Sequence, residues 1–568
     1  MKHWPLDLWR SLSGTGLLLG TLFFAASLTP SLIPRTYLTQ GVLGGGMFAI
    51  GYGLGVFWRW LWGYLELPIL RERTLRIANL GIAFLCAAMV AAFLWRAAEW
   101  QNSIRTLMEL EPVTSAHPFK VCAVAALTFV VLLGLARLFL LIHRLVAGQF
   151  RRVVPRRVAN VIGVAIALLL FWSLATDVLF AFALRVVDSS FQQHDALIEP
   201  TTPQPTSPLK TGGPASLLSW EQLGRAGREF IASGPSASDI SAASGRDAIE
   251  PIRVYVGLRA ADTPAERARL ALDELQRAGA FERSTLIVIT PTGTGWVDPG
   301  AMDSIEYLLH GDVASVAMQY SYLASPLALL VQPGYGAESA RALFSQVYEH
   351  WRSLPRDARP KLYLHGLSLG AMNSERSTQL FEIFEDPVQG ALWTGAPFAS
   401  TIWRWVTDAR NPGSPAWLPQ FRDGSLVCFM NQNGVSVRPG SAWGRMRIVY
   451  LQYASDAITF FEPRALYRRP DWMEAPHGPD VSPELRWYPV VTILQLGLDM
   501  LMANGTPMGY GHVFAPVHYV DAWLTLMEVE GWSPDRIAGL KERLTRSAAA
   551  ALAAPEDDKE DAYSNRGG

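Results

Sequence analysis

The chain has 568 residues, of which 50% are hydrophobic and only 17% are charged. An average soluble domain carries about 25% charged residues, and disordered chains contain few aromatic residues, so the 20 Trp exclude a disordered protein. The formal charge of −1 excludes a global basic field for nucleic acid, and three Cys are too few for a disulfide framework. No Cys/His cluster has the spacing of a zinc site, so we expect neither metal nor cofactor.

Residues 1–188 predict an all-α membrane domain. They contain five apolar stretches, each near the roughly 20 residues needed to cross a bilayer core of about 30 Å. The stretches lie at about 12–34, 41–66, 75–95, 119–142 and 158–184. A cleaved signal peptide is an alternative for the first stretch, but it is long for that role and four more follow.

Lys and Arg concentrate in alternate loops between these stretches, at ten against three. The ten are Lys2, Arg10, Arg71, Arg73, Arg76, Arg144, Arg151, Arg152, Arg156 and Arg157; the three are Arg35, Arg96 and Arg105. Because basic loops stay in the cytoplasm, this bias predicts a cytoplasmic N-terminus. With five spans, everything after about residue 188 is predicted to lie outside the cytoplasm.

Residues 189–250 predict a tether. The segment TTPQPTSPLKTGGPAS is rich in Pro, Ser, Thr and Gly, with little apolar surface to pack. A short helix is expected in the following SWEQLGRAGREFIASGP. At the other end of the chain, residues 546–568 predict a charged, disordered tail.

Residues 251–545 predict an α/β domain, because short β-branched runs alternate with helical segments. We expect a mostly parallel sheet with helices on both faces. The expected strands are 252–258, 284–290, 313–320, 361–366, 390–396 and 447–453, with 425–430 as a further candidate, and the expected helices are 263–278, 337–352, 369–382, 484–503 and 515–529.

The fourth main strand runs into Gly366-Leu367-Ser368-Leu369-Gly370 and then a helical segment. This is G-x-S-x-G between a strand and a helix, the context of a nucleophile elbow. Both Gly366 and Gly370 are needed, because a Cβ at either position would clash with the neighbouring strand or helix. The pattern predicts Ser368 as a nucleophile; the alternative is a serine in a tight structural turn.

A serine nucleophile requires a base and an orienting carboxylate, which in this fold follow in the order acid, then His. Asp456 comes directly after the strand 447–453, as a triad acid requires. It could also be an ordinary helix N-cap. The other acidic candidates are Asp423, Asp471 and Asp480.

Three His follow Asp456 in the sequence. His512 lies in the Gly-rich loop MGYGHVF, where the backbone can bring an imidazole over the elbow, and is our candidate base. His518 falls within the following helix and is expected to pack there, whereas His477 is expected on a surface loop. His365, beside the elbow, is expected in or near the core.

Two backbone N–H groups should bind the oxyanion. One is that of Leu369, at the start of the helix after Ser368. The other is expected from Thr292 or Gly293, in the loop PTGTGW that follows the second strand. A phosphate-binding loop is the alternative for this segment, but no Walker lysine follows.

The segment at about 398–445, rich in Trp and Pro, predicts a cap over the site, or else aromatic packing around a loop. The apolar stretch 487–502 is short for a span and contains Asp499, so we expect a buried or interfacial helix.

Several of these stretches resemble a bacterial alpha/beta-hydrolase family of membrane proteins, once grouped as a domain of unknown function. In that family a multi-span N-terminal domain precedes a hydrolase domain. The similar stretches are SWEQLGRAGREFIASGP, PIRVYVGL, TPTGTGWVDP, VAMQYSYL, LHGLSLGA, YLQYASD and GYGHVFAPVHYVDAW. The resemblance implies Ser368 as nucleophile, Asp456 as acid and His512 as base. Relatives carry an acidic residue where this chain has Leu367, which changes the charge expected at the mouth of the pocket.

We therefore expect a membrane-anchored serine hydrolase of the esterase or lipase type. Its expected partners are the bilayer and an ester or thioester substrate, such as a lipid or another acylated envelope molecule. An acyltransferase that uses the same acyl-enzyme is one alternative. A non-catalytic membrane sensor or scaffold is another, and a transporter is a weaker one, because no polar row recurs along the spans.

Overall fold

The computed structural model describes residues 12–68, 72–173, 202–322, 334–378, 385–436 and 442–553. The chain forms two compact units. The helical unit comprises Met1–Val186 and Phe461–Pro507, and the α/β unit comprises Val187–Phe460 and Met508–Gly568. The predicted 251–545 domain is thus interrupted, since residues 461–507 group with the N-terminal helices.

Four helices of the described chain are long and apolar enough to cross a membrane. They are α3 (Tyr37–Tyr64), α4 (Glu72–Leu107, apolar from Ile77), α5 (Pro118–Phe150) and α6 (Arg156–Ser173). The expected span at 12–34 differs, because only α2 (Gly14–Ser27) is helical, about 21 Å at 1.5 Å per residue. Pro30 and Pro34 explain its early end. The expected span at 158–184 continues past residue 173, outside the described residues, where Asp177 also falls.

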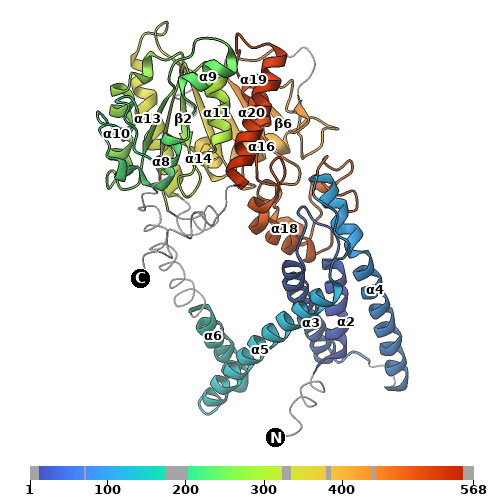
Figure 1. The fold of residues 1–568 in the computed structure, drawn as a ribbon. Coiled ribbons are helices and arrows are strands. Elements are labelled where there is room, and N and C mark those ends of the chain that lie inside the picture. The colour runs from blue at the N-terminus through green and yellow to red at the C-terminus, as the bar shows by residue number, and fades with distance from the viewer. Residues whose placement is uncertain are drawn as a thin grey trace, which may run out of the picture. The chain divides into compact units, whose positions relative to one another are not determined.

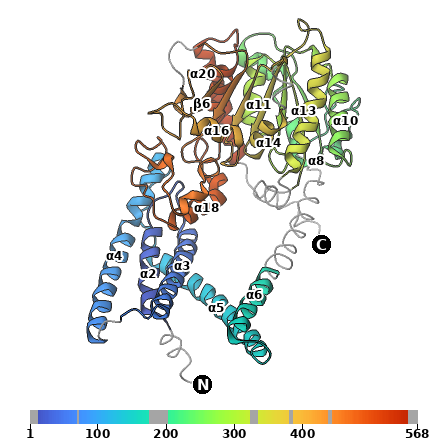
Figure 2. The same ribbon diagram turned by 180° about the vertical axis from the view of Figure 1, so that it is seen from behind.

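Helices α2 and α3 lie side by side, as Figure 1 and Figure 2 show from opposite directions. Glycines permit this approach. A Cβ on Gly55 of α3 would lie 2.5 Å from the Thr15 carbonyl oxygen, and a Cβ on Gly20 of α2 would lie 2.8 Å from that of Phe48. Small residues at a helix interface are typical of membrane domains, and several glycines of the second predicted span, such as Gly51 and Gly55, allow this packing.

After α2 the chain is irregular and buried until α3 begins. Its polar groups are bonded by segment 461–507, which contains η4 (Pro463–Leu466), η5 (Asp471–Met473), α18 (Val491–Met502) and η6 (Ala503–Gly505). The Arg35 guanidinium lies 3.2 Å from the Asp499 carboxylate, and both side chains are buried. The two parts of the helical unit are therefore joined by a buried ion pair.

The predicted tether is folded where it is described. It forms η2 (Trp220–Leu223), α8 (Gly224–Ala232) and α9 (Ala237–Ser244). Trp220, Leu223 and Phe230 are buried, and the Thr211 hydroxyl donates to the Arg253 carbonyl at 3.1 Å. Residues 202–250 thus pack onto the first strand. A few large apolar side chains supply the buried surface, although the segment as a whole is rich in Pro and Ser. Residues 189–201 lie outside the described residues.

The α/β unit is built on one sheet of eight strands in the order β1-β3-β2-β4-β5-β8-β6-β7. All neighbouring strands are parallel except the β6–β7 pair. The strands are β1 (Ile252–Val256), β2 (Thr285–Thr290), β3 (Val313–Met318), β4 (Lys361–Leu367), β5 (Gly390–Thr394), β6 (Val427–Asn431), β7 (Gly434–Ser436) and β8 (Arg447–Leu451). β6 and β7 lie within the expected cap at 398–445, so that segment is in part an extension of the sheet.

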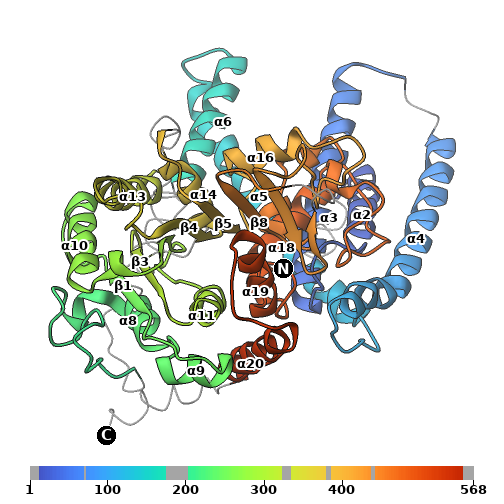
Figure 3. The same cartoon turned by 90° about the horizontal axis from the view of Figure 1, so that it is seen from above.

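Helices cover both faces of the sheet. α13 and α14 lie on one face, and α11 and α19 on the other (Figure 3). The helices are α10 (Pro264–Arg277), η3 (Ala280–Glu282), α11 (Pro299–Leu308), α13 (Tyr335–Ser353), α14 (Leu369–Ser377), α16 (Thr401–Asp408), α17 (Ala457–Phe460), α19 (Pro516–Leu526) and α20 (Pro534–Ala553). α20 extends eight residues into the expected tail at 546–568, and the remainder lies outside the described residues.

Candidate active site

The strand–turn–helix around Ser368 has the backbone of a nucleophile elbow. Ser368 lies between β4 and α14 with φ 57° and ψ −127°, a conformation that L-residues rarely adopt. A Cβ on Gly366 would lie 2.5 Å from the backbone of Gly370, and one on Gly370 would lie 2.1 Å from the Thr290 carbonyl oxygen. Both glycines are therefore required by close backbone contacts.

Asp456 and His512 form a buried pair at the ends of two segments far apart in sequence. His512 Nδ1 donates to Asp456 Oδ2 at 2.7 Å. The same carboxylate accepts the Ile458 N–H at 2.9 Å and the Thr459 hydroxyl at 3.0 Å. These bonds orient the carboxylate, and Nδ1 is the ring nitrogen of His512 that faces it.

The loop that carries His512 is held against the end of β5. Gly511 N–H donates to the Ser455 hydroxyl at 2.9 Å. A Cβ on Gly395, whose φ is +52°, would lie 2.6 Å from His512 Cε1. The preceding residue, Thr394, accepts the Ser368 N–H at 2.9 Å. Ser368 and His512 therefore both adjoin Thr394-Gly395, and the buried His512 Nε2 has no hydrogen-bond partner among the described residues.

The PTGTGW loop lies against the elbow, because the backbone of Gly370 comes close to the carbonyl groups of both Thr290 and Pro291. Thr292 N–H is already donated to the Trp296 carbonyl at 3.0 Å. The N–H of Thr292 is therefore occupied in this conformation, and a second oxyanion donor from this loop stays a prediction. On the other side, Leu369 is the first residue of α14, and the first N–H groups of a helix have no carbonyl partner within it.

The alternative bases lie elsewhere. His518 Nδ1 is 2.5 Å from the Tyr453 hydroxyl, and burial lowers its pKa to about 4. His365 is buried with Nδ1 bonded to the Leu392 carbonyl at 3.0 Å, and burial lowers its pKa to about 4 as well. Both are expected to stay neutral at physiological pH. Their contacts are those of packed residues, as the sequence predicts.

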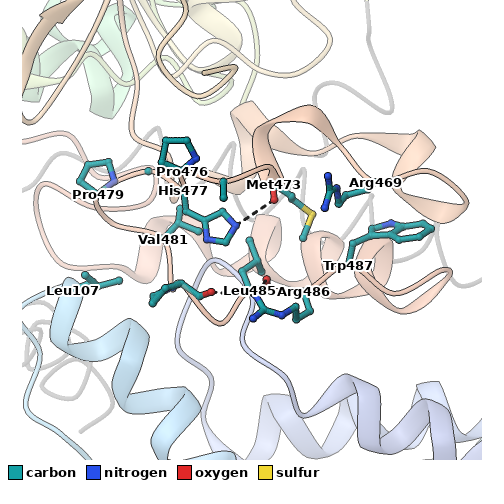
Figure 4. Close-up of a pocket in the computed structure, with 13 residues that line it drawn as sticks. Leu107, Arg469, Met473, Pro476, His477, Pro479, Val481, Leu485, Arg486 and Trp487 are labelled. Carbon is teal, nitrogen blue, oxygen red and sulfur yellow. Dashed lines mark hydrogen bonds between the residues drawn. The ribbon is translucent and has the colours of Figure 1, made fainter. Parts of the chain in front are cut away.

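The third alternative, His477, lies in the helical unit. It lines a pocket of about 750 Å³ formed by residues 469–487 and Leu107, and its Nε2 donates to the Met473 carbonyl at 3.2 Å (Figure 4). None of Ser368, Asp456 and His512 lines this pocket. Of the alternative acids, Asp471 and Asp480 also belong to segment 461–507, and Asp423 accepts the Ser425 N–H and hydroxyl.

Two further carboxyl groups, half-buried Asp298 and buried Glu375, were not identified from the sequence. Asp298 begins α11 and accepts the Tyr519 hydroxyl at 2.9 Å; desolvation raises its pKa to about 6. Glu375 in α14 accepts the Tyr450 hydroxyl and the Ile402 N–H, and burial raises its pKa to about 7. The Asp-Pro pair at 298–299 is a helix-start signal that could have located the first. Nothing in the local sequence marks Glu375 as buried.

A mostly parallel sheet with helices on both faces and a tight turn from β4 into α14 defines the alpha/beta-hydrolase class of fold. Comparison with known families agrees. Residues 252–540 match the alpha/beta-hydrolase family, and residues 28–235 match the N-terminus of an alpha/beta-hydrolase family. The chain belongs to this family, with its helical N-terminal region. Comparison with curated proteins and with solved structures gives no match. Among the described residues, no three His, Cys, Asp or Glu side chains group as metal ligands.

Proposed function

We propose that the protein is a membrane-anchored serine hydrolase with Ser368, His512 and Asp456 as its catalytic triad. The observation that carries the proposal is the 2.7 Å bond between His512 Nδ1 and Asp456 Oδ2, beside a strained Ser368 backbone. A structural serine in a turn requires neither a buried His–Asp pair nor an unpartnered imidazole nitrogen next to it.

In the proposed reaction the Ser368 hydroxyl attacks the carbonyl carbon of an ester or thioester. His512 Nε2 takes the hydroxyl proton while Nδ1–H stays bonded to Asp456, whose negative charge stabilises the imidazolium. The electrons of the carbonyl π bond move to the oxygen, and the resulting oxyanion is bound by the N–H of Leu369 and by a second N–H from the PTGTGW loop. The C–O or C–S bond then breaks, and His512 returns the proton to the leaving alcohol or thiol. Water repeats these steps on the acyl-enzyme and releases the acid.

The proposed topology places the α/β unit outside the cytoplasm. Within the helical unit, α2 runs antiparallel to α3, from Thr15 beside Gly55 to Ser27 beside Gln40. The basic loop 144–157 joins the far ends of α5 and α6, whereas segment 461–507 contacts the opposite end, at Arg35. Because basic ends stay cytoplasmic, that segment and the chain continuing from it lie on the other face. A cytoplasm-only reporter that is active when fused at residue 205 would overturn this topology.

A lipid or other acylated envelope molecule is the proposed substrate class, because the helical unit keeps the site near a bilayer. The test of the triad is labelling of membranes with a fluorophosphonate, which reacts with an activated serine. We expect the full-length protein to be labelled and Ser368→Ala to remain unlabelled at equal abundance. His512→Gln should lower the labelling rate by at least about a thousandfold. Absence of labelling in the wild type, or equal labelling of Ser368→Ala, would falsify the proposal.

A further inference from the structure

Helix α18 in the helical unit buries its polar residues and exposes two of its leucines. Thr492, Gln495 and Asp499 are buried, at 2% exposure or less. Leu494 and Leu501, on another face of the same helix, are 39% and 72% exposed. A helix on a water-soluble surface has the reverse arrangement, so water is not the natural environment of this exposed face.

The polar face of α18 is held by the irregular segment between α2 and α3. Asp499 accepts the Leu32 N–H at 2.9 Å and pairs with Arg35. Gln495 Nε2 donates to the Thr29 carbonyl at 3.1 Å. These partners satisfy backbone groups that no helix bonds, which a bilayer would leave unsatisfied at a cost of several kcal/mol each. The orientation of α18 is thus set by specific bonds, and its apolar face is turned outward as a consequence.

Further exposed apolar and basic residues lie beside the start of α18. Val490 N–H donates to the Leu466 carbonyl at 2.9 Å, so η4 adjoins the start of α18. Leu466 and Tyr467 are exposed, and Arg464 and Arg468 beside them are exposed as well. We name this surface the lipid face; it consists of Arg464, Leu466, Tyr467, Arg468, Leu494 and Leu501.

We propose that the lipid face is embedded in the boundary between the acyl chains and headgroups of the bilayer. The inference rests on the membrane anchoring proposed above. The proposal is supported by a direct contact with a membrane helix, since Val491 of α18 packs on Leu43 and Met47 of α3. Exposed leucines contact acyl chains, whereas Tyr467 and the two arginines are residue types that lie at the headgroup level. A phospholipid surface matches this combination of apolar centre and basic rim.

The position of α18 in the chain gives this contact a consequence for the proposed site. Segment 461–507 begins five residues after Asp456 and ends five residues before His512. The chain therefore enters the bilayer boundary between the triad acid and the triad base.

Fluorescence quenching in nanodiscs of phosphatidylcholine tests the proposal. Leu501→Cys and Leu494→Cys in the full chain are labelled with bimane, and the exposed Glu349→Cys of α13 is the matched control. The labelled wild-type chain gives the background of Cys86, Cys122 and Cys428. Lipid carrying a doxyl group on the acyl chain should quench positions 494 and 501 by about twofold or more, and iodide should quench position 349 alone.

Failure of the doxyl lipid to quench positions 494 and 501 overturns the proposal. Quenching of positions 494 and 501 by iodide would then show that the lipid face is in contact with water. Cross-linking of two differently tagged copies of the Leu501→Cys variant would instead show that a second copy covers it. The measurement requires no enzymatic activity, and we expect the same quenching in the Ser368→Ala background. Loss of the lipid contact is therefore distinguishable from failure of the proposed hydrolase function.

Discussion

The two units of this protein differ in where they place large apolar side chains. In the α/β unit, the strands β1, β2, β3 and β5 are buried along their whole length and are mostly apolar. In the helical unit, large apolar side chains such as Trp58 and Phe84 are more than half exposed, while Ser31, Arg35 and Gln40 are buried. The difference reflects the solvent each surface meets. Segment 461–507 also buries polar side chains and exposes large apolar ones, as the rest of the helical unit does, although its sequence lies within the hydrolase region.

The largest expected effect tests the polar interior of the helical unit. Asp499→Ala leaves Arg35 buried without its counter-ion, and removing one partner of a buried pair costs about 3–5 kcal/mol of stability. We expect a large drop in the thermal midpoint of the full protein in detergent. Glu99→Ala is the control, because its pair with Arg96 is exposed and worth about 0–1 kcal/mol. Equal midpoints for the two variants would contradict the comparison, and the exchange Arg35→Asp with Asp499→Arg should restore part of the loss.

The next effect concerns a carboxyl group that the α/β unit buries without a cation. Glu375 keeps its proton in the folded state to about pH 7, whereas its ordinary pKa is 4.5. The unfolded chain releases this proton at a lower pH than the folded chain does. The free energy of unfolding therefore falls as pH rises from about 4.5 to 7. At about 1.4 kcal/mol per pKa unit the loss approaches 3 kcal/mol. Glu375→Gln should remove this slope. We would measure thermal midpoints of both proteins at pH 5 and pH 8; parallel changes would refute the assignment.

A similar effect in the α/β unit is expected on activity rather than stability. Gly395→Ala places a Cβ 2.6 Å from His512 Cε1 and should displace the imidazole. Misplacement of a catalytic group by about 1 Å costs about 100-fold, so the rate of fluorophosphonate labelling should fall by about that factor. Gly413→Ala is the control, because its φ of +84° carries the same backbone strain in open space. Comparable labelling rates in the two variants would show that the contact of Gly395 with His512 does not matter for the site.

The smallest effect tests how closely the helices of the helical unit approach. Gly55→Leu must push α3 away from α2, because its Cβ already lies 2.5 Å from the Thr15 carbonyl oxygen. Overpacking of this kind costs about 1–3 kcal/mol. Gly53→Leu, two residues away with no atom within 4 Å of its Cβ, should leave the thermal midpoint unchanged. A loss of stability in Gly53→Leu as large as that in Gly55→Leu would rule out the glycine contact as the cause.

Most strands of the α/β unit could be predicted from the sequence, because buried parallel strands consist of short runs of apolar residues. The predicted strand at 284–290 is β2, and that at 447–453 contains β8. β7 was missed, since its three residues after Asn433 carry only a turn signal. The candidate strand at 425–430 corresponds to β6 (Val427–Asn431), which lies within the expected cap.

The placement of segment 461–507 could not be predicted, because it depends on contacts between residues hundreds of positions apart. One signal was present: Thr492, Gln495 and Asp499 recur at the spacing of one helical face within an otherwise apolar stretch. Likewise, Pro30 and Pro34 already indicated that the first apolar stretch could not be helical throughout. The candidate acid was identified by its position after a strand and the candidate base by its Gly-rich loop, but the occupied N–H of Thr292 depends on a turn geometry that the sequence leaves open.

The ion pair between Arg35 and Asp499 has a consequence for biosynthesis. Its partners are 464 residues apart in the chain. At about 5–20 residues per second of synthesis, Arg35 waits roughly half a minute to a minute and a half for its counter-ion. During that time the first helices must be retained with an uncompensated cation between them. A chain that terminates anywhere before residue 499 never acquires the pair, so its Arg35 stays without this counter-ion.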